Sequence, residues 1–276
     1  MTHYEFRYSA HPRDVDTYST EELRKHFLID NLFSKDQIHW TYTMYDRYIV
    51  GGALPRTIDL KLETIPYLKA DRFLDRREMG VINVGGKGSI KVDGDIFELN
   101  HKEALYIAKG TKNVIFERGE NPVYYINSAP AHHRYKTTKV GKSQAEVVEL
   151  GDSLLSNQRT IYKLIVNSIV PTCQLQMGLT ELKPGSVWNT MPAHTHERRM
   201  EIYFYFELLK EQTVCHFMGQ PQQTRHLFVQ NHQAVISPEW SIHCGAGTSN
   251  YTFIWAMAGE NLDYSDMDVC PVDKLR

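Results

Sequence analysis

The chain has 276 residues, of which 42% are hydrophobic and 11% aromatic, and its formal net charge is −2 at pH 7. This composition excludes a disordered chain, because such chains have few aromatic residues and a high net charge. No run approaches the ~18 consecutive apolar residues of a membrane span. The balance of 31 basic against 33 acidic residues argues against a nucleic-acid-binding protein.

A helix is expected near the N-terminus, within residues 17–32. Ser19 is a candidate N-cap, and Leu23 and Phe27 belong to an apolar stripe at helical spacing. A weaker helical pattern covers residues 151–160. The stretch before the first helix is polar and the four cysteines are widely spaced, so we expect a cytoplasmic protein with reduced thiols.

Beyond the first helix, short runs of β-branched and aromatic residues alternate with turn residues. Residues 38–54 end in Gly-Gly, which we interpret as a turn. Gly-Gly and Asp-Gly divide residues 80–100 into three short strands joined as hairpins. Many short strands with few helices are typical of an all-β sandwich or small barrel. Further strands are predicted at 162–170, 172–182, 186–191, 200–209, 213–219, 225–230, 233–238 and 251–259.

The two halves of the chain contain an internal repeat. Three pairs of segments resemble each other in the same order: 76–84 with 198–206, 100–113 with 231–243, and 124–129 with 251–256. A change in loop length accounts for the small differences in offset. We therefore predict two domains, 1–145 and 146–276, which divide in the polar stretch around residues 140–155.

The second half contains a histidine pattern typical of metal sites. His194 and His196 are two residues apart, so in a strand they point to the same face. Glu201 opens the next strand-like run, and His243 follows Pro238 on a later one. Three imidazoles and one carboxylate suit Zn²⁺, Mn²⁺, Fe²⁺, Co²⁺ or Ni²⁺. We predict a metal site made of these four residues.

The spacing of these residues resembles the two metal-binding motifs of the cupins, a family of double-stranded β-barrels. The first motif is Gly185 followed by HTHxxxxE from His194 to Glu201, and the second is PxxxxH from Pro238 to His243. The resemblance implies an all-β, duplicated cupin barrel, or bicupin, with a few short helices.

Longer stretches are similar to one group of cupins, the 5-keto-4-deoxyuronate isomerases of pectin and uronate degradation. The similarity runs over essentially the whole chain and is strongest at 80–94, 184–206 and 225–261. It implies a homohexamer with one zinc ion per subunit. The implied zinc ligands are His194, His196, Glu201 and His243.

The resemblance implies conversion of 5-dehydro-4-deoxy-D-glucuronate (4-deoxy-L-threo-5-hexosulose uronate) to 3-deoxy-D-glycero-2,5-hexodiulosonate. A proton moves from C2 to C1 while the C1 carbonyl becomes a hydroxyl, and the metal stabilises negative charge on oxygen. Three alternatives stay open: the related 5-deoxy-glucuronate isomerase, a cupin Fe(II) dioxygenase, and a non-catalytic sugar-binding cupin.

Residues beside the metal motif are candidates for proton transfer. If Glu201 faces the barrel interior, alternation turns Tyr203 and Tyr205 inward as well, either as proton carriers or as part of the barrel wall. Glu239 precedes His243 and is a further candidate acid or base.

A uronate substrate also requires groups that bind its carboxylate and hydroxyls. Arg199 follows the histidine pair and suits a carboxylate, and Lys163 and Arg159 are rival candidates. Gln176 and Thr180 lie on one face of the preceding strand, where they can bind a polyol.

The first repeat lacks the ligand residues. Through the repeat, His194 and His196 correspond to Arg72 and Leu74, and His243 corresponds to Asn113. Glu201 corresponds to Met79, or to Glu78 if the register shifts by one. We therefore expect the N-terminal barrel to hold no metal and to serve packing and oligomer contacts.

Overall fold

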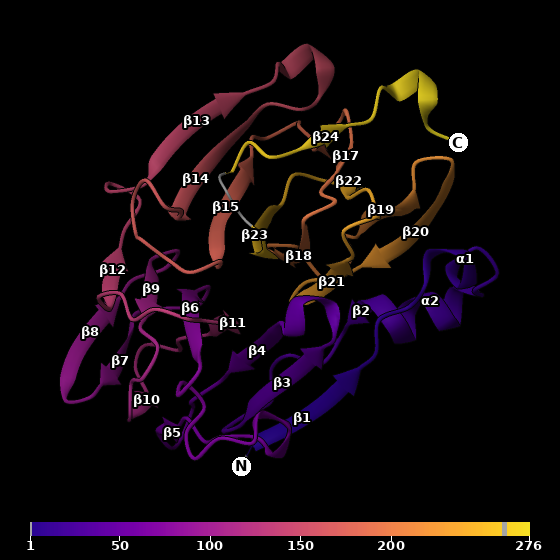
Figure 1. Cartoon of the computed structure of the whole chain (residues 1–276). Helices are drawn as coiled ribbons and strands as arrows, with labels where there is room; N and C mark the ends of the chain where they lie inside the picture. Colours follow the sequence, from indigo (N-terminus) through magenta and orange to yellow (C-terminus); the bar gives the residue numbers. More distant parts are fainter. Residues whose placement is uncertain (1, 261–263) are drawn as a thin grey trace. The chain divides into compact units, whose positions relative to one another are not determined.

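The computed structural model describes residues 2–260 and 264–276, which are rich in β-strands (Figure 1). The chain divides into two compact units, each built from three segments of the sequence. Unit 1 comprises the described residues of Met1–Arg7, Asn31–Ala145 and Leu164–Gln176, and unit 2 those of Tyr8–Asp30, Glu146–Lys163 and Met177–Arg276. Among the described residues, no helix has the length and apolar character needed to cross a membrane.

Unit 1 consists of two sheets and two short 3₁₀ turns. Its elements are β1 (Thr2–Arg7), β3 (Ile38–Thr43), η1 (Tyr45–Arg47), β4 (Ile49–Ala53), β5 (Leu60–Lys61), η2 (Pro66–Leu68), β6 (Arg77–Asn83), β7 (Gly88–Val92), β8 (Asp95–Leu99), β9 (Ala104–Ile107), β10 (Val114–Phe116), β11 (Tyr124–Pro130) and β12 (Thr138–Val140). One sheet has the strand order β1-β3-β4-β11-β6-β9-β12, and the other has the order β5-β10-β7-β8.

Unit 2 contains the described helices and three sheets. Its elements are α1 (Pro12–Val15), α2 (Thr20–Phe27), β2 (Leu28–Ile29), β13 (Glu146–Leu150), η3 (Ser153–Leu155), β14 (Arg159–Ile165), β15 (Gln176–Leu182), β16 (Trp188–Asn189), β17 (His194–Thr195), β18 (Arg199–Phe206), β19 (Val214–Gln220), β20 (Gln223–Val229), β21 (Gln233–Ser237), β22 (Cys244–Gly247), β23 (Thr252–Gly259), β24 (Asp268–Val269) and η4 (Val272–Lys274). The strand orders are β13-β14-β15-β23-β18-β21-β2, β16-β22-β19-β20, and β17-β24.

The two units have the same strand topology, which confirms the repeat predicted from the sequence. In the seven-stranded sheets, β11-β6-β9 of unit 1 matches β23-β18-β21 of unit 2. These are the strands in which the three repeated segments lie. In the four-stranded sheets, β10-β7-β8 matches β22-β19-β20. The all-β, duplicated architecture is thus the one that the strand pattern and the repeat predicted.

Two segments belong to a different unit from the one that the predicted domain boundary implies. One boundary between the units falls after residue 145, but residues 8–30 belong to unit 2 and residues 164–176 to unit 1. In the first of these segments, Ser19 caps α2 and β2 follows directly. Strand β2 then pairs with β21 and supplies the outer strand of the seven-stranded sheet in unit 2. A single domain boundary at residue 145 therefore assigns these two segments to the wrong units.

The predicted helices are shorter than their sequence patterns. Helix α2 covers Thr20–Phe27 of the predicted 17–32, because the next two residues pair as a strand. The weaker pattern at 151–160 forms only the 3₁₀ turn η3, and β14 begins at Arg159.

Two of the three glycine-based turn predictions are wrong. Gly51 and Gly52 lie inside β4 rather than in a turn, and a Cβ on Gly51 would lie 2.1 Å from Cε3 of Trp40. Glycine is therefore needed there to admit the indole ring. Gly85-Gly86 connects two different sheets and forms no hairpin. The Asp93-Gly94 hairpin between β7 and β8 is confirmed, and both residues have positive φ, as a tight hairpin turn requires.

A buried carboxylate organises the segment at residues 173–175 of unit 1. Glu78 on β6 is fully buried. Its Oε1 accepts hydrogen bonds of 2.9 Å from the backbone N–H groups of Gln174 and Leu175. Its Oε2 accepts from the Cys173 N–H at 2.9 Å and from the Tyr106 hydroxyl at 2.8 Å. Glu78 is thus a structural acceptor for unit 1.

Replacing Glu78 by alanine is expected to lower the free energy of unfolding by about 3 kcal/mol or more, because it leaves several buried donors unpaired. Glu78→Gln, which keeps one acceptor oxygen, should cost less. The exposed Glu98 on β8 offers a matched control, and Glu98→Ala should change stability by less than about 0.5 kcal/mol. Denaturant unfolding of the three variants tests this. Equal midpoints for Glu78→Ala and Glu98→Ala would contradict it.

Candidate metal centre

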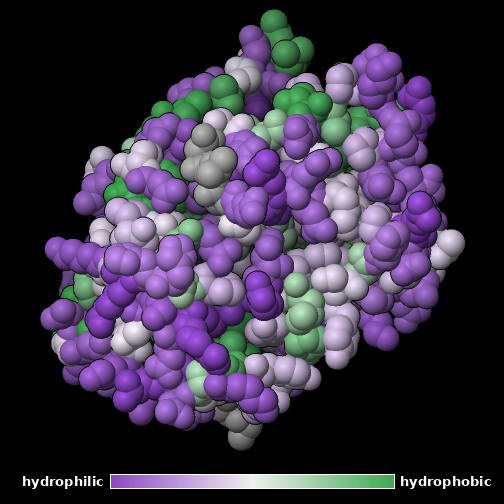
Figure 2. Space-filling view, viewed as in Figure 1, coloured by the Kyte–Doolittle hydropathy of each residue, from purple (hydrophilic) through white to green (hydrophobic). Residues whose placement is uncertain are grey.

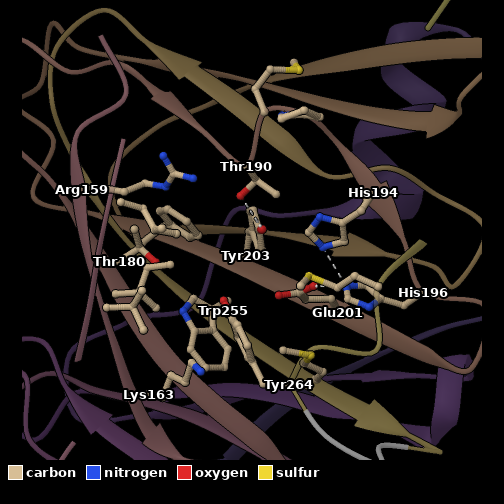
Figure 3. A pocket seen from close by; sticks show the side chains of 18 of the residues that line it. Arg159, Lys163, Thr180, Thr190, His194, His196, Glu201, Tyr203, Trp255 and Tyr264 are labelled. Carbon is tan, nitrogen blue, oxygen red and sulfur yellow. Dashed lines mark hydrogen bonds and ion pairs between the residues drawn. The ribbon is translucent and has the colours of Figure 1, made fainter. Parts of the chain in front are cut away.

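A pocket of about 320 Å³ lies against one face of the seven-stranded sheet of unit 2 (Figure 3). Alternation along the strands decides which side chains reach it, since residues two apart share a face. The sheet residues that line it are Val148, Leu150, Arg159, Ile161, Lys163, Thr180, Glu201, Tyr203, Phe253, Trp255 and Met257. The other lining residues are Thr190, Met191, Pro192, His194, His196, Tyr264, Met267 and Val269.

Three of the predicted metal ligands, His194, His196 and Glu201, line this pocket, and the fourth, His243, lies beside them. His194 lies on β17, where it pairs with Val269 of β24, and His196 follows that short strand. Glu201 lies on β18, and His243 directly precedes β22. All four side chains are buried, and their ligand atoms lie within 4.8 Å of one another. The structure thus brings together the whole set predicted from the sequence.

The ligand atoms are close enough to share one ion. The Nε2 atom of His194 lies 3.0 Å from the Nε2 atoms of both His196 and His243, and the latter two are 3.2 Å apart. Oε2 of Glu201 lies 2.9 Å from Nε2 of His196 and 2.8 Å from Nε2 of His243. Ligands that each lie roughly 2.0–2.2 Å from a common ion are separated from one another by about this much.

The electrostatics of the site favour a cation. Burial, with a smaller contribution from His243 and His196, lowers the pKa of His194 to about 2. Burial also lowers the pKa of His196. Burial alone would raise the pKa of Glu201. Electrostatic attraction to His243, together with hydrogen bonds to His196 and His243, outweighs burial and holds the pKa of Glu201 well below its usual range. A neutral imidazole, favoured at His194 and His196, and an ionised carboxylate, favoured at Glu201, are the protonation states that bind metal ions.

Backbone carbonyls orient two of the imidazoles. Nδ1 of His196 lies 3.0 Å from the Asp266 carbonyl oxygen, and Nδ1 of His243 lies 3.3 Å from that of Ser241. With the proton on Nδ1 donated to a carbonyl, the Nε2 lone pair points to the centre of the site. In this arrangement the Nε2 lone pairs of His196 and His243 point toward Nε2 of His194 and the Glu201 carboxylate, and together these groups form a donor set suited to a cation.

Arg199 contacts the candidate metal ligand His196 and does not line the pocket. The side chain is 1% exposed, and its Nη2 atom donates to the carbonyl oxygens of Asp266 at 2.9 Å and Tyr264 at 3.3 Å. Its Nε lies 3.0 Å from Nδ1 of His196, a contact that competes with the Asp266 carbonyl for the same nitrogen. Nδ1 accepts from this Nε–H in one tautomer of His196 and donates to the Asp266 carbonyl in the other, and the second tautomer leaves Nε2 unprotonated and able to bind a metal ion. Arg199 thus holds the segment that orients His196.

The three candidates for proton transfer lie in different surroundings. Tyr203 lines the pocket, and its hydroxyl lies 3.0 Å from Oγ1 of Thr190. Tyr205 lies outside the pocket, where its hydroxyl bonds Nδ1 of His216 at 2.7 Å. Glu239 does not line the pocket either, and it contributes its backbone carbonyl, which accepts from the His196 N–H at 3.3 Å. Of the three, only Tyr203 is placed to reach a molecule in the pocket.

The substrate-binding candidates differ in whether they line the pocket. Lys163, Arg159 and Thr180 line the pocket, whereas Gln176 does not. Nζ of Lys163 is bound to Oε1 of Glu146 at 2.6 Å and lies over the Tyr264 ring. Gln176 is buried, with both amide atoms unpaired among the described residues.

No pattern in the sequence points to the residues that complete the pocket. Thr190 precedes the metal motif in a left-handed conformation, with φ of 52°. Tyr264 and Met267 come from the segment that leads to β24. Neither stretch has a periodic pattern. The pairing of β24 with β17 brings them to the site, and such a two-residue strand leaves no signal in the sequence.

Comparison with known proteins agrees with this architecture. The KduI/IolB family matches residues 33–270 of the chain. The chain belongs to this family. It is 59% identical to a 4-deoxy-L-threo-5-hexosulose-uronate ketol-isomerase of Formosa agariphila, over 100% of this chain and 99% of that one. It is 54% identical to the protein of the same name from Bacteroides fragilis, with the same coverage.

The fold is also found in a solved structure with a distant sequence. An IolB-like protein from Salmonella typhimurium superposes with a TM-score of 0.66 at 15% identity, covering 81% of this chain and 87% of that one. The duplicated cupin fold and the resemblance inferred from the sequence motifs are thereby confirmed.

Proposed function

We propose that this KduI/IolB family member is a metal-dependent ketol-isomerase that converts 5-dehydro-4-deoxy-D-glucuronate to 3-deoxy-D-glycero-2,5-hexodiulosonate in pectin and uronate degradation. One observation carries the proposal. Three imidazole nitrogens and the carboxylate of Glu201 converge beside the pocket, in a chain whose full-length relatives bear the name of this isomerase.

The metal of this proposal is one zinc ion per subunit, held by His194, His196, Glu201 and His243. The donor set supports it, because imidazole nitrogens and a carboxylate oxygen are ligands that zinc accepts. The same donors accept Mn²⁺, Fe²⁺, Co²⁺ and Ni²⁺, so metal analysis decides among them. When bound, such an ion acts as a Lewis acid toward the substrate's oxygen atoms.

Residues of the pocket would then carry out the proton transfers. The reaction removes a proton from C2 and adds one to C1, and a hydroxyl proton passes from the C2 oxygen to the C1 oxygen, so no oxidant or reductant is needed. Burial, followed by the charge of Glu201, raises the pKa of Tyr203 well above its usual value. Tyr203 therefore holds its proton at neutral pH, and we assign it the role of donor to substrate oxygen, with Thr190 as its hydrogen-bond partner.

We further propose that unit 1 is a degenerate cupin domain without a metal. Met79 on β6, the counterpart of Glu201, is buried in an apolar core with Leu74 and Val81. Glu78, the alternative counterpart, belongs to the hydrogen-bonded cluster described above. Arg72, Leu74 and Asn113, the counterparts of the three histidines, line one cavity of unit 1, which supports the correspondence.

We also propose a cytoplasmic location. The cysteines Cys173, Cys215, Cys244 and Cys270 are all free thiols. Reduced thiols are typical of proteins of the cytoplasm. A fractionation experiment with an antibody to the chain tests this.

We also propose that the chain forms a homo-oligomer, specifically a hexamer. Strand β13 is the outer strand of its sheet, and it exposes Val147 and Leu150. Leu154 and Leu155 in the following turn are 91% and 68% exposed. Figure 2 shows apolar surface over this segment, at the top of the view. Exposed apolar side chains on an edge strand are typical of a protein–protein contact.

The double variant Leu154→Asp/Leu155→Asp is expected to yield smaller assemblies, since a buried charge in an apolar contact is costly. Sedimentation velocity of this variant and of the wild type measures the change. Lys142→Asp provides a control in the polar stretch that precedes β13. An unchanged hexamer in the double variant would remove η3 from the contact, and a wild-type monomer would contradict the oligomer.

The isomerase assignment is tested by following substrates and products by NMR. The metal-loaded protein should convert 5-dehydro-4-deoxy-D-glucuronate and leave 5-deoxy-glucuronate unchanged, with no uptake of oxygen. Turnover of 5-deoxy-glucuronate alone would transfer the assignment to the related isomerase. Oxygen uptake with either substrate would favour a dioxygenase, and binding without turnover would favour a sugar-binding cupin.

A further inference from the structure

The pocket has a second polar end, away from the metal ligands. Figure 3 shows His194, His196 and Glu201 gathered on one side of the view and Arg159 and Lys163 on the other. Both cations lie on β14, four residues apart, so the alternation of the strand turns them to the same face. The pocket therefore offers two cationic groups to the end of a substrate that does not reach the metal.

Lys163 already has an anionic partner. Its Nζ lies 2.6 Å from Oε1 of Glu146 on the neighbouring strand β13, and 4.6 Å from the centre of the Tyr264 ring. The pairing is part of the strand register, because Glu146 lies directly opposite Lys163. This contact offsets the charge of the ammonium before any substrate enters.

Arg159 has no such partner among the described residues. Its Nη1 donates to the Asn157 carbonyl oxygen at 2.7 Å, which fixes the position of the guanidinium. A guanidinium has five N–H donors in a planar fork, so four are left for a ligand. Burial lowers the pKa of Arg159, and the groups that act against this are tyrosines rather than carboxylates. A half-buried cation of this kind is complementary to a carboxylate with two oxygens.

The spacing of the strands fits a six-carbon acid. Strand β14 is separated from β18, which carries Glu201, by β15 and β23. Three strand spacings amount to about 14 Å. A six-carbon chain spans roughly 6 Å from C1 to C6, with C–C bonds of about 1.5 Å, and the side chains of Arg159 and of the metal ligands cover the remainder. A substrate with its reacting C1 and C2 near the metal ligands thus places its C6 carboxylate toward Arg159.

We propose that Arg159, rather than Lys163 or Arg199, binds the carboxylate of the substrate and thereby makes the pocket selective for uronic acids over neutral sugars. This inference rests on the proposed function for the identity of the substrate. Arg199 is excluded because it does not line the pocket and its guanidinium donates to the backbone carbonyl oxygens of Tyr264 and Asp266. Lys163 is excluded because its ammonium is already paired with the carboxylate of Glu146.

Arg159→Met tests the inference, with Arg159→Lys as the conservative variant. We expect Arg159→Met to raise KM for the uronate by at least about 30-fold, the effect of leaving a bound charge without its partner, while kcat stays within about threefold. The lysine variant should recover part of this loss. For an uncharged analogue of the substrate, in which a hydroxymethyl group replaces the carboxylate, the wild type and Arg159→Met should have the same KM.

Control variants separate this effect from a general loss of charge. Arg118→Met removes an exposed arginine of unit 1 and should leave the kinetics unchanged. Metal content and thermal unfolding should match the wild type in every variant. An unchanged KM in Arg159→Met would overturn the inference, and so would a larger rise in KM for Lys163→Met than for Arg159→Met.

Calorimetric titration of the metal-free protein with the uronate measures binding without turnover. Weaker binding by Arg159→Met supports the assignment even if the wild-type holoenzyme fails to convert the uronate, a failure that would contradict only the proposed function. Equal binding by wild type and Arg159→Met would overturn the role of Arg159 and leave the proposed function standing.

Discussion

Replacing His243 by alanine is expected to remove the metal and the isomerase activity together. His243 is 1% exposed, and its Nε2 lies within 3.2 Å of the ligand atoms of three other residues. Without it the site offers two imidazoles and a carboxylate, and the metal affinity falls. Because a bound ion would, under the proposed function, supply several kcal/mol of transition-state stabilisation, we expect activity to fall by about 10³-fold or more. Metal analysis and activity assays on the same samples measure both effects.

His194→Ala should behave in the same way, whereas His226→Ala should not. His226 lies on β20, is exposed and is absent from the pocket, so its loss controls for the removal of an imidazole. Full activity in a His243→Ala protein shown to be free of metal would refute a catalytic metal, while leaving the fold as described.

Tyr203→Phe is expected to lower kcat by about 10²-fold and to leave the metal content unchanged. The substitution removes only the hydroxyl, which lies 3.0 Å from Oγ1 of Thr190. A positioned proton donor contributes about 10²–10⁴-fold to the rate of such a reaction. Since the phenyl ring still packs against Phe253 and His243, the pocket should keep its shape. Steady-state kinetics at saturating substrate measure the loss.

Tyr205→Phe provides the contrast on the same strand. Tyr205 bonds His216 away from the pocket, so its hydroxyl contributes to stability, by about 1 kcal/mol, and its loss should leave kcat within about threefold. A larger loss of kcat in Tyr205→Phe than in Tyr203→Phe would assign the proton donor to Tyr205. Equal, small effects of both changes would exclude a tyrosine donor.

The sequence was most informative where one local pattern determines the structure. Alternation along a strand is enough to place Glu201 and Tyr203 on one face, and the His194/His196 spacing places two imidazoles together. Most strand runs of the second half therefore correspond to strands in the structure, and the four candidate ligand residues lie together. The repeat also predicted which strands of unit 1 and unit 2 correspond, because each repeated segment forms one strand.

The features that the sequence did not predict depend on contacts between distant segments. Residues 8–30 join unit 2 because β2 completes a sheet through β21, a pairing that spans about 200 residues of chain. The Gly51-Gly52 pair resembles a turn, yet it serves the packing of Trp40. Choosing among Arg159, Lys163 and Arg199 required their partners, since all three have the same charge in the sequence. In the structure Lys163 pairs with Glu146, and Arg199 donates to the carbonyl oxygens of Tyr264 and Asp266. Arg159 has no carboxylate partner among the described residues.

Removal and return of the metal is the measurement that tests the central claim most directly. The protein is assayed with 5-dehydro-4-deoxy-D-glucuronate as purified, after dialysis against a chelator, and after stoichiometric Zn²⁺ is added, with metal content determined at each step. We predict that activity falls in proportion to the metal and returns with one zinc ion per chain. Undiminished isomerase activity after complete removal of the metal would contradict a catalytic metal centre at His194, His196, Glu201 and His243.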